Sequence, residues 1–148
     1  MLRWLLSALH LLAFGIGLGA IWARARALRE AADPVRLRGA LQADTWWGIA
    51  ALLWLGTGLP RLFGGLEKPP SYYLANHIFW FKLALFGLTV VLELGPAITL
   101  GRWRRTLARG QRPDASLAPR WARVSQLQIA LLLIMLLAAT AVARGFGG

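Results

Sequence analysis

Four mostly apolar stretches alternate along the chain with polar stretches that are rich in arginine. The apolar stretches cover residues 4–23, 45–63, 78–100 and 124–143. An α-helix rises about 1.5 Å per residue and satisfies its own backbone hydrogen bonds, so roughly 20 apolar residues cross a hydrocarbon layer of about 30 Å. Each stretch is therefore predicted to be a membrane-spanning helix.

Short connections between these stretches predict how the spans are arranged. Sequential helices joined by short loops become antiparallel neighbours. The expected fold is all-α, an integral membrane up-down-up-down four-helix bundle that forms a single membrane domain over residues 1–148. Asp33 before Pro34 predicts the start of a short helix that leads into the second span, and Pro69–Pro70 predicts a rigid turn.

The composition agrees with a membrane protein. Hydrophobic residues make up 57% of the 148 residues and the mean hydropathy is +0.53, more apolar than a soluble domain of this size. Cysteine is absent, which excludes disulfides, thiolate zinc sites, iron–sulfur clusters and covalently attached haem. The formal net charge is +11, so the loops must be strongly basic.

The distribution of these cations predicts the orientation. Two loops, 24–44 and 101–123, hold twelve basic residues: Arg24, Arg26, Arg29, Arg36, Arg38, Arg102, Arg104, Arg105, Arg109, Arg112, Arg120 and Arg123. The opposite side holds four: Arg3, Arg61, Lys68 and Arg144. The positive-inside rule then predicts a bacterial inner-membrane protein with cytoplasmic basic loops and periplasmic termini. The expected partner of the arginines is anionic lipid rather than nucleic acid.

Residues 1–23 also have an alternative interpretation as a cleaved signal peptide. Arg3 resembles the charged start of such a peptide, and residues 23–25 loosely resemble a cleavage site. The apolar run is longer than the roughly 7–15 residues of a signal-peptide core, and arginines follow it. A spanning helix is therefore favoured.

Small residues recur within the spans. Gly15 and Gly19 form a G-x-x-x-G pair on the first span, and Gly48, Gly56 and Gly58 lie on the second. Such residues let membrane helices approach closely. They serve packing within the bundle, a homodimer or a partner membrane protein, and the sequence leaves these alternatives open.

Three ionisable residues are expected at membrane depth: His10, Lys82 and Glu93. Burying such groups in lipid is costly, so they are functional candidates. His10 is expected about 10 Å and Lys82 about 6 Å below the outer boundary, where the two could meet. Glu93 belongs to the cytoplasmic half, with structural bonding and proton transfer as open alternatives. It is expected near the polar residues of neighbouring spans, Asp44, Gln126 and Gln128.

His10 also suits the axial position of a haem b, which needs an imidazole within a helical bundle. Arg61 or Lys68 could hold the propionates, and His77 or Lys82 could fill the second axial position, which is otherwise open. With two histidines and no cysteine, a dedicated copper path is disfavoured. The plainer alternatives are a hydrogen-bonded neutral His10 and a Lys82 that extends to the membrane surface.

Three segments carry a resemblance to a known family: LHLLAFGIGLGAIWARARALR, DTWWGIAALLWLGTGLPRLF and FWFKLALFGLTVVLELGPAITLGRWRR. They are similar to a family of predicted bacterial membrane proteins that is known as a domain of unknown function. The resemblance extends over about residues 8–145. It implies four membrane helices and no assigned chemistry.

A fainter resemblance is to the four-helix membrane protoporphyrinogen oxidases and the related copper resistance protein D-like group. His10 and Lys82-Leu83 match the first-span His and third-span Lys-Leu of the oxidases. The Pro60-Arg61 pair follows the second span here rather than the first, and the late third-span His and Cys are absent. What this resemblance implies is association with haem.

Three functional hypotheses follow. One is a redox or tetrapyrrole-linked protein that binds haem b through His10 and Lys82. Another is a non-catalytic accessory or structural subunit of a larger membrane complex. The third is a small proton-coupled carrier that uses Glu93. No catalytic motif is present, so whether the protein is an enzyme stays open.

Overall fold

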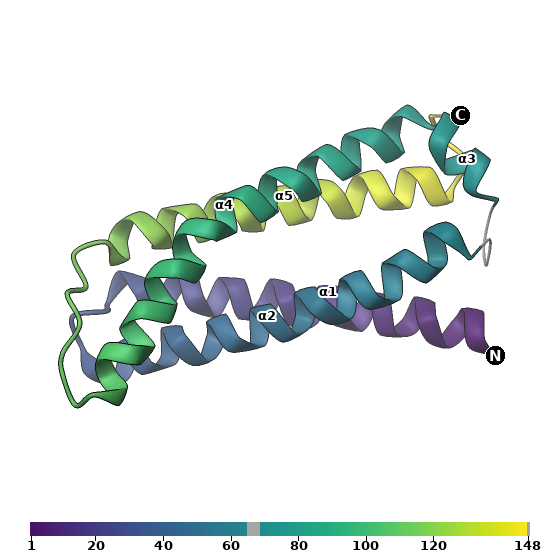
Figure 1. Ribbon diagram of the computed structural model, residues 1–148. Helices are drawn as coiled ribbons and strands as arrows, with labels where there is room; N and C mark the ends of the chain where they lie inside the picture. Colours follow the sequence, from purple (N-terminus) through teal and green to yellow (C-terminus); the bar gives the residue numbers. More distant parts are fainter. Residues whose placement is uncertain (65–68, 148) are drawn as a thin grey trace.

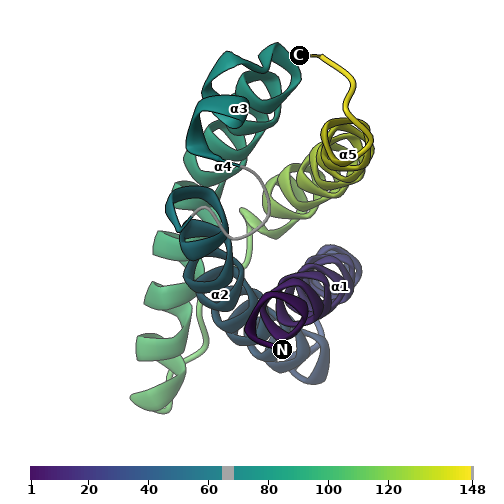
Figure 2. The same ribbon diagram turned by 90° about the vertical axis from the view of Figure 1, so that its right-hand side faces the viewer.

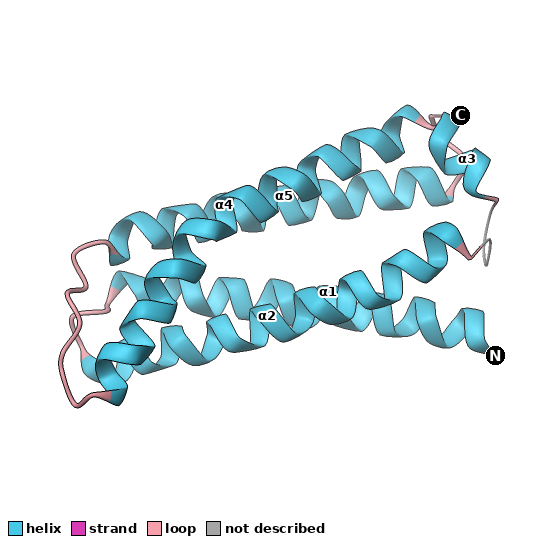
Figure 3. Ribbon diagram, in the orientation of Figure 1, coloured by secondary structure: helices cyan, strands magenta, loops and turns pink. Residues whose placement is uncertain are grey.

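The computed structural model describes residues 1–64 and 69–147, and within them every regular element is a helix (Figure 3). The elements in chain order are α1 (Leu2–Arg29), α2 (Pro34–Phe63), α3 (Pro70–Ala75), α4 (His77–Ala108) and α5 (Ala118–Ala143). The prediction of an all-α protein is confirmed.

The four long helices run alternately in opposite directions, and both ends of the chain lie at the same end of the molecule (Figure 1). We call this the terminal end. The opposite end carries the connections 30–33 and 109–117, and we call it the arginine-rich end. Viewed along the helices, α1 lies beside α2 and α5, and α4 lies beside α5 (Figure 2). Helices α1 and α4 therefore occupy diagonal positions.

The helices extend beyond the predicted spans at the arginine-rich end. α1 continues to Arg29 instead of ending near residue 23, and α4 continues to Ala108. A hydropathy window marks the apolar part of a helix, whereas Ala, Leu and Arg are all good helix formers and prolong it. As a result, Arg24 lies within α1 and not in a loop.

The first connection ends where the sequence indicates. The Asp33 side chain accepts a hydrogen bond from the backbone N–H of Val35 at 2.8 Å, and Pro34 is the first residue of α2. This side chain satisfies one of the free N–H groups of a helix start, and proline costs nothing at that position. The short helix expected from Pro34 is continuous with the second predicted span.

The second connection contains the six-residue helix α3 where a rigid turn was expected. The Tyr72 hydroxyl donates to the carbonyl of Val142 at 3.2 Å, and the Asn76 side-chain amide donates to the carbonyl of Phe146 at 2.9 Å. These bonds attach α3 and the start of α4 to the end of α5. Lys68, a candidate partner for propionates, lies outside the described residues.

Three helices, α1, α4 and α5, are long and apolar enough to cross a membrane. The described part of α2 is not in this group, although residues 45–63 were predicted as a span. Its apolar residues are interrupted by Trp46, Trp47 and Thr57, and Arg61 follows near its end. The prediction of four spans is thus supported for three of them.

Helix α4 changes direction in its second half and crosses toward α2 (Figure 1). Pro96 lies inside this helix, where it lacks the N–H that would complete the helical hydrogen bond. At the neighbouring Gly95, an added Cβ would lie 2.5 Å from Cη2 of Trp121. The glycine therefore lets the Trp121 ring of α5 approach the α4 backbone.

The bend also places apolar side chains of α4 in the core at the arginine-rich end. Leu100 and Trp103 are buried there against Leu28 of α1, Leu37 of α2 and Trp121 of α5. Because all four long helices contribute, this cluster closes the bundle at that end.

Candidate functional site

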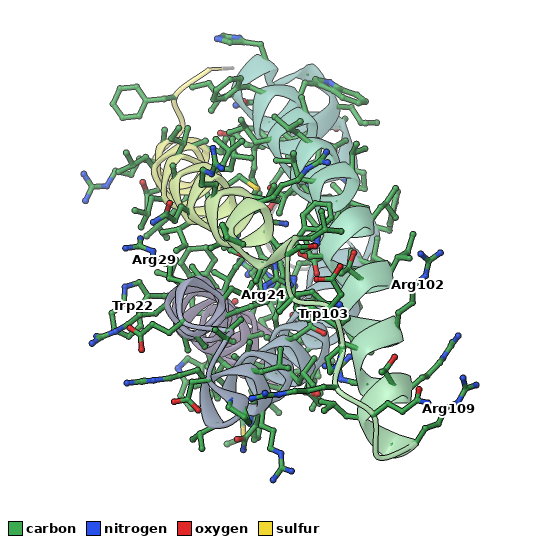
Figure 4. The ribbon with its side chains drawn as sticks, turned by 90° about the vertical axis from the view of Figure 1, so that its left-hand side faces the viewer. Trp22, Arg24, Arg29, Arg102, Trp103 and Arg109 are labelled. Carbon is green, nitrogen blue, oxygen red and sulfur yellow. The ribbon has the colours of Figure 1, made fainter. Side chains whose placement is uncertain are left out.

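Arg24 is the centre of a buried polar network. Its side chain has no exposed surface, and it lies among the helices while Arg29, Arg102 and Arg109 point outward (Figure 4). A guanidinium group has five N–H donors in one plane. Five hydrogen bonds from Arg24 match them, so every donor of this side chain is used within the chain.

Glu93 of α4 binds the guanidinium with both carboxylate oxygens. Arg24 Nη1 lies 2.6 Å from Oε1, and Arg24 Nη2 lies 2.8 Å from Oε2. The amide Nε2 of Gln128 also donates to Oε2 at 2.9 Å and to the carbonyl of Thr89 at 3.2 Å. A bidentate arginine–carboxylate pair is among the strongest polar contacts in proteins, so this pair couples α1 firmly to α4.

Asp44 of α2 is shared between two arginines. Arg24 Nη1 donates to Oδ1 at 2.7 Å, and Arg104 Nη2 donates to Oδ2 at 2.8 Å. Arg104 also donates to the Leu41 carbonyl at 2.7 Å and to the Thr45 hydroxyl oxygen at 3.1 Å. Its position depends on the bend at Pro96, because the bend carries the last turns of α4 toward α2.

Helix α5 completes the shell with two fully buried side chains. The Ser125 Oγ accepts from Arg24 Nε at 3.1 Å, and the Gln128 Oε1 accepts from Arg24 Nη2 at 3.0 Å. All four long helices thus contribute to one network. Its two arginines and two carboxylates balance, and this electroneutrality lowers the cost of burying Arg24 and Asp44 and of partly burying Glu93 and Arg104.

Sequence reasoning anticipated part of this network. Glu93, Asp44 and Gln128 are brought together as expected, whereas Gln126 is exposed. Arg24 and Arg104 were missed because both were counted as loop cations. A signal for them exists in the charge pattern: two carboxylates near membrane depth need cations, and Arg24 follows directly after the first apolar stretch.

At the terminal end, His10 contacts α2. Its Nδ1 lies 2.9 Å from the Thr57 hydroxyl oxygen, and its ring centroid lies 5.6 Å from that of Trp54. The Thr57 hydroxyl donates its proton to the Leu53 carbonyl at 2.7 Å, so we assign Nδ1 as the donor to Thr57. A Cβ on Gly58 would lie 3.1 Å from the imidazole, so this glycine gives the ring room.

The other described residues considered for a cofactor lie on α2 and α4. Arg61 is half-buried near the end of α2, and Lys82 is half-buried in the first part of α4. His77 is exposed at the start of α4, and its backbone N–H donates to the Gly147 carbonyl at 3.2 Å. The meeting of His10 with Lys82 stays a prediction. In the described part of the chain, no three His, Asp or Glu side chains gather as metal ligands.

A groove of about 360 Å³ runs between α1 and α2 on the outer surface. It is lined mainly by small residues, among them Gly15, Gly19 and Ala23 of α1 and Gly39 and Ala43 of α2. An added Cβ at Gly15, Gly19 or Gly39 would meet no atom within 4 Å. The G-x-x-x-G pair is therefore not used for packing within the described chain.

Gly17 behaves differently from its neighbours. An added Cβ there would lie 3.2 Å from the Trp47 ring and 3.4 Å from Ala50, so Gly17 is the glycine that lets α1 and α2 approach. The sequence left open whether the small residues of α1 pack within the bundle or against another chain, and the structure separates the two uses. Gly17 serves packing inside the bundle, and Gly15 and Gly19 face outward.

In the described residues every regular element is a helix, and three of these helices are long and apolar enough to cross a membrane, as is typical of integral membrane proteins. The sequence matches the family described as "Predicted membrane protein (DUF2214)" over residues 2–147, and the chain belongs to that family. The resemblance to an uncharacterised family of predicted membrane proteins is thereby confirmed. No curated protein and no solved structure matches the chain.

Proposed function

We propose that the protein is a non-catalytic membrane subunit that packs against a partner within a larger assembly. The observation that carries this proposal is that every hydrogen-bond donor of the buried Arg24 side chain already has a partner. All five N–H groups of Arg24 donate hydrogen bonds to side chains of its own chain. A substrate would have to displace one of these bonds and leave a buried charge without its partner, which is costly.

The bonding of Glu93 supports the same role over a proton-coupled carrier. This carboxylate accepts two hydrogen bonds from Arg24 and one from Gln128. A transported proton would have to compete with a bidentate arginine for the same oxygens. Structural bonding is therefore the use of Glu93 that the geometry supports.

The open groove between α1 and α2 supports a partner helix as the neighbour. Membrane helices associate through small residues because close backbone approach gains van der Waals contact. Gly15 and Gly19 offer such an approach along α1, and no described residue fills the space above them. We infer that a membrane-spanning helix of the partner lies in this groove.

The proposed placement is an inner membrane, with the arginine-rich end in the cytoplasm and both termini on the periplasmic side. In this placement α2 joins α1, α4 and α5 as a fourth span of an up-down-up-down bundle. Helix α2 packs along α1, which shields part of its less apolar surface from lipid. The excess of arginine at the arginine-rich end, in residues 24–44 and 101–123, supports this orientation.

Native mass spectrometry after crosslinking in the original membrane tests the proposal. The wild-type chain should be recovered with a partner, and the double variant Gly15→Leu/Gly19→Leu should lose it. The matched control is Gly48→Leu/Gly56→Leu, because these glycines also face open space but do not line the groove. A wild-type chain recovered only as a monomer, or a groove variant that keeps its partner, would contradict the proposal.

The geometry of His10 supports haem binding as a second candidate function. Histidines that bind metals usually donate their other ring N–H to a neighbouring group, which fixes the ring. The bond from His10 Nδ1 to Thr57 is of this kind. The visible spectrum of protein purified from haem-replete cells tests this candidate. Absorption that disappears in His10→Ala and survives in the exposed control His77→Ala would support it, and a colourless wild-type preparation would dismiss it.

A further inference from the structure

The arginines of the arginine-rich end divide into two groups. Arg24 and Arg104 are committed to the buried network, and Arg36 pairs with Glu30 at 2.9 Å. The others are exposed, and they come from all four long helices and the connection after α4. Representative members are Arg29, Arg38, Arg102, Arg109 and Arg123.

The carboxylates near this end are already engaged by the chain. Asp44 and Glu93 belong to the buried network, Glu30 binds Arg36, and Asp33 caps α2. Asp114 accepts hydrogen bonds from Ser116. Among the described residues, the exposed arginines of this end other than Arg36 therefore have no ion pair with a carboxylate. Their natural counter-charge is an external anion.

The exposed arginines surround the bundle instead of forming one face. In the view from this end, Arg29 lies on one side of the molecule, and Arg102 and Arg109 lie on the other (Figure 4). A duplex or single strand of nucleic acid needs its cations gathered along one groove or face. A lipid leaflet surrounds a membrane protein and meets cations on every side.

Exposed tryptophans lie close to these arginines along the helices. Trp22 is 55% exposed, and the guanidinium of Arg26 lies 5.4 Å from its ring centroid. Trp46 is 50% exposed on the neighbouring α2. Tryptophan favours the headgroup region, where its ring is half in apolar surroundings. The cations near these rings are therefore within reach of lipid phosphates.

We propose that the exposed arginines of this end bind the phosphate groups of anionic phospholipids, which form a ring around the bundle. The proposal depends on insertion of the chain into a membrane and not on the partner proposed for the groove. Each arginine near a negatively charged leaflet contributes up to about a fivefold preference for anionic lipid. The preference is electrostatic, so added salt should reduce it.

The test uses the full chain in lipid nanodiscs that contain phosphatidylcholine and the anionic phosphatidylglycerol. The protein is extracted in mild detergent, and its retained lipids are measured. Wild type should be enriched in phosphatidylglycerol, and Arg29→Gln/Arg102→Gln should lower this enrichment several-fold. The matched control is Arg3→Gln/Arg144→Gln, which removes two exposed arginines at the terminal end and should leave the enrichment unchanged.

Equal enrichment in the two double variants would overturn the proposal. So would nucleic acid that copurifies with the chain and displaces phosphatidylglycerol. A measurement on the wild-type chain alone is also informative if a variant fails to fold. The phosphatidylglycerol enrichment of wild type should fall as the sodium chloride concentration is raised. An enrichment that does not depend on salt would count against the proposal. Inorganic phosphate at matched ionic strength should not replace the lipid, because it lacks an acyl chain to hold it at the headgroup level.

Discussion

The two ends of the bundle are held together by different kinds of interaction. At the arginine-rich end, charged side chains of α1, α2 and α4 meet with polar side chains of α5, and Arg24 is fully buried at their centre. At the terminal end, α1 meets α2 through one hydrogen bond between His10 and Thr57, and Trp54 connects them to Phe86 of α4 with ring centroids 5.7 Å apart. One end depends on charged side chains, and the other depends on aromatic contacts and on neutral hydrogen bonds such as those of Thr57, Tyr72 and Asn76.

This difference shows how the cost of a mutation depends on what remains after it. Removing one partner of a buried charge leaves the other without compensation, and the penalty is large. Removing one aromatic or neutral polar contact leaves a smaller deficit. The predictions below compare the two ends by the free energy of unfolding in detergent micelles, from the largest expected effect to the smallest.

The largest effect is expected for Arg24→Ala. The variant leaves Asp44 with Arg104 alone and removes the cation from Glu93, so a loss of about 3–5 kcal/mol is expected. Arg24→Lys should recover part of this loss, because lysine keeps the charge but cannot bind Glu93 in the bidentate form. The control is Arg26→Ala, two residues further along the same helix and exposed. Equal stability of the Arg24 and Arg26 variants would refute the structural role of the network.

A smaller loss of about 1–3 kcal/mol is expected for Gly95→Ala. The added methyl group would lie 2.5 Å from the Trp121 ring, so either the ring or the bend in α4 must shift. Shortening the ring with Trp121→Phe in the same chain should restore part of the stability. Gly87→Ala on the same helix meets no neighbour and should not destabilise. If both alanine variants have the same stability, the close approach of Trp121 does not require a glycine at position 95.

The Arg104→Ala variant should cost about 1–2 kcal/mol, less than Arg24→Ala. Arg104 is 39% exposed, so water replaces some of its bonds, and Asp44 keeps its bond to Arg24. A spin-label distance between the end of α4 and the start of α2 should lengthen, because Arg104 joins them. A loss as large as that of Arg24→Ala would show that the outer arginine is the essential one.

The smallest effect, about 1 kcal/mol, is expected at the terminal end for Thr57→Val. The substitution keeps the shape of the side chain and removes the hydroxyl that accepts from His10. Thr140→Val, at an exposed threonine of α5, controls for the loss of a hydroxyl that binds only its own helix. A Thr57→Val loss close to that of Arg24→Ala would remove the contrast between the two ends.

Several features were accessible from the order of residues because they depend on local chemistry. Asp33 and Pro34 mark the start of α2, and long apolar stretches mark α1, α4 and α5 as helices that can cross a membrane. The expected neighbours of Glu93 followed from counting helical rise inward from each span end. The ends of α1 and α4 at the arginine-rich end were predicted too early, because hydropathy marks the apolar part of a helix and not the residue where helical hydrogen bonding stops.

The roles of individual glycines and arginines were decided in three dimensions. The sequence marks Gly15 and Gly19 as a packing pair, yet it is Gly17 that faces Trp47, because residues two apart on a helix point in different directions. The sequence places Arg24 and Arg26 among the same loop cations, yet one is buried and the other exposed.

The chain's composition and its apolar stretches already specify a helical membrane protein with a basic end, since helix formation and lipid solubility depend on residue type over short distances. Which arginine enters the core is a different matter. It depends on the meeting of Arg24, Asp44 and Glu93 from three helices, and on the bend near Pro96 that brings Arg104 to the same carboxylate. Such pairing is set by the distances between helices, and these arise only when the bundle is packed.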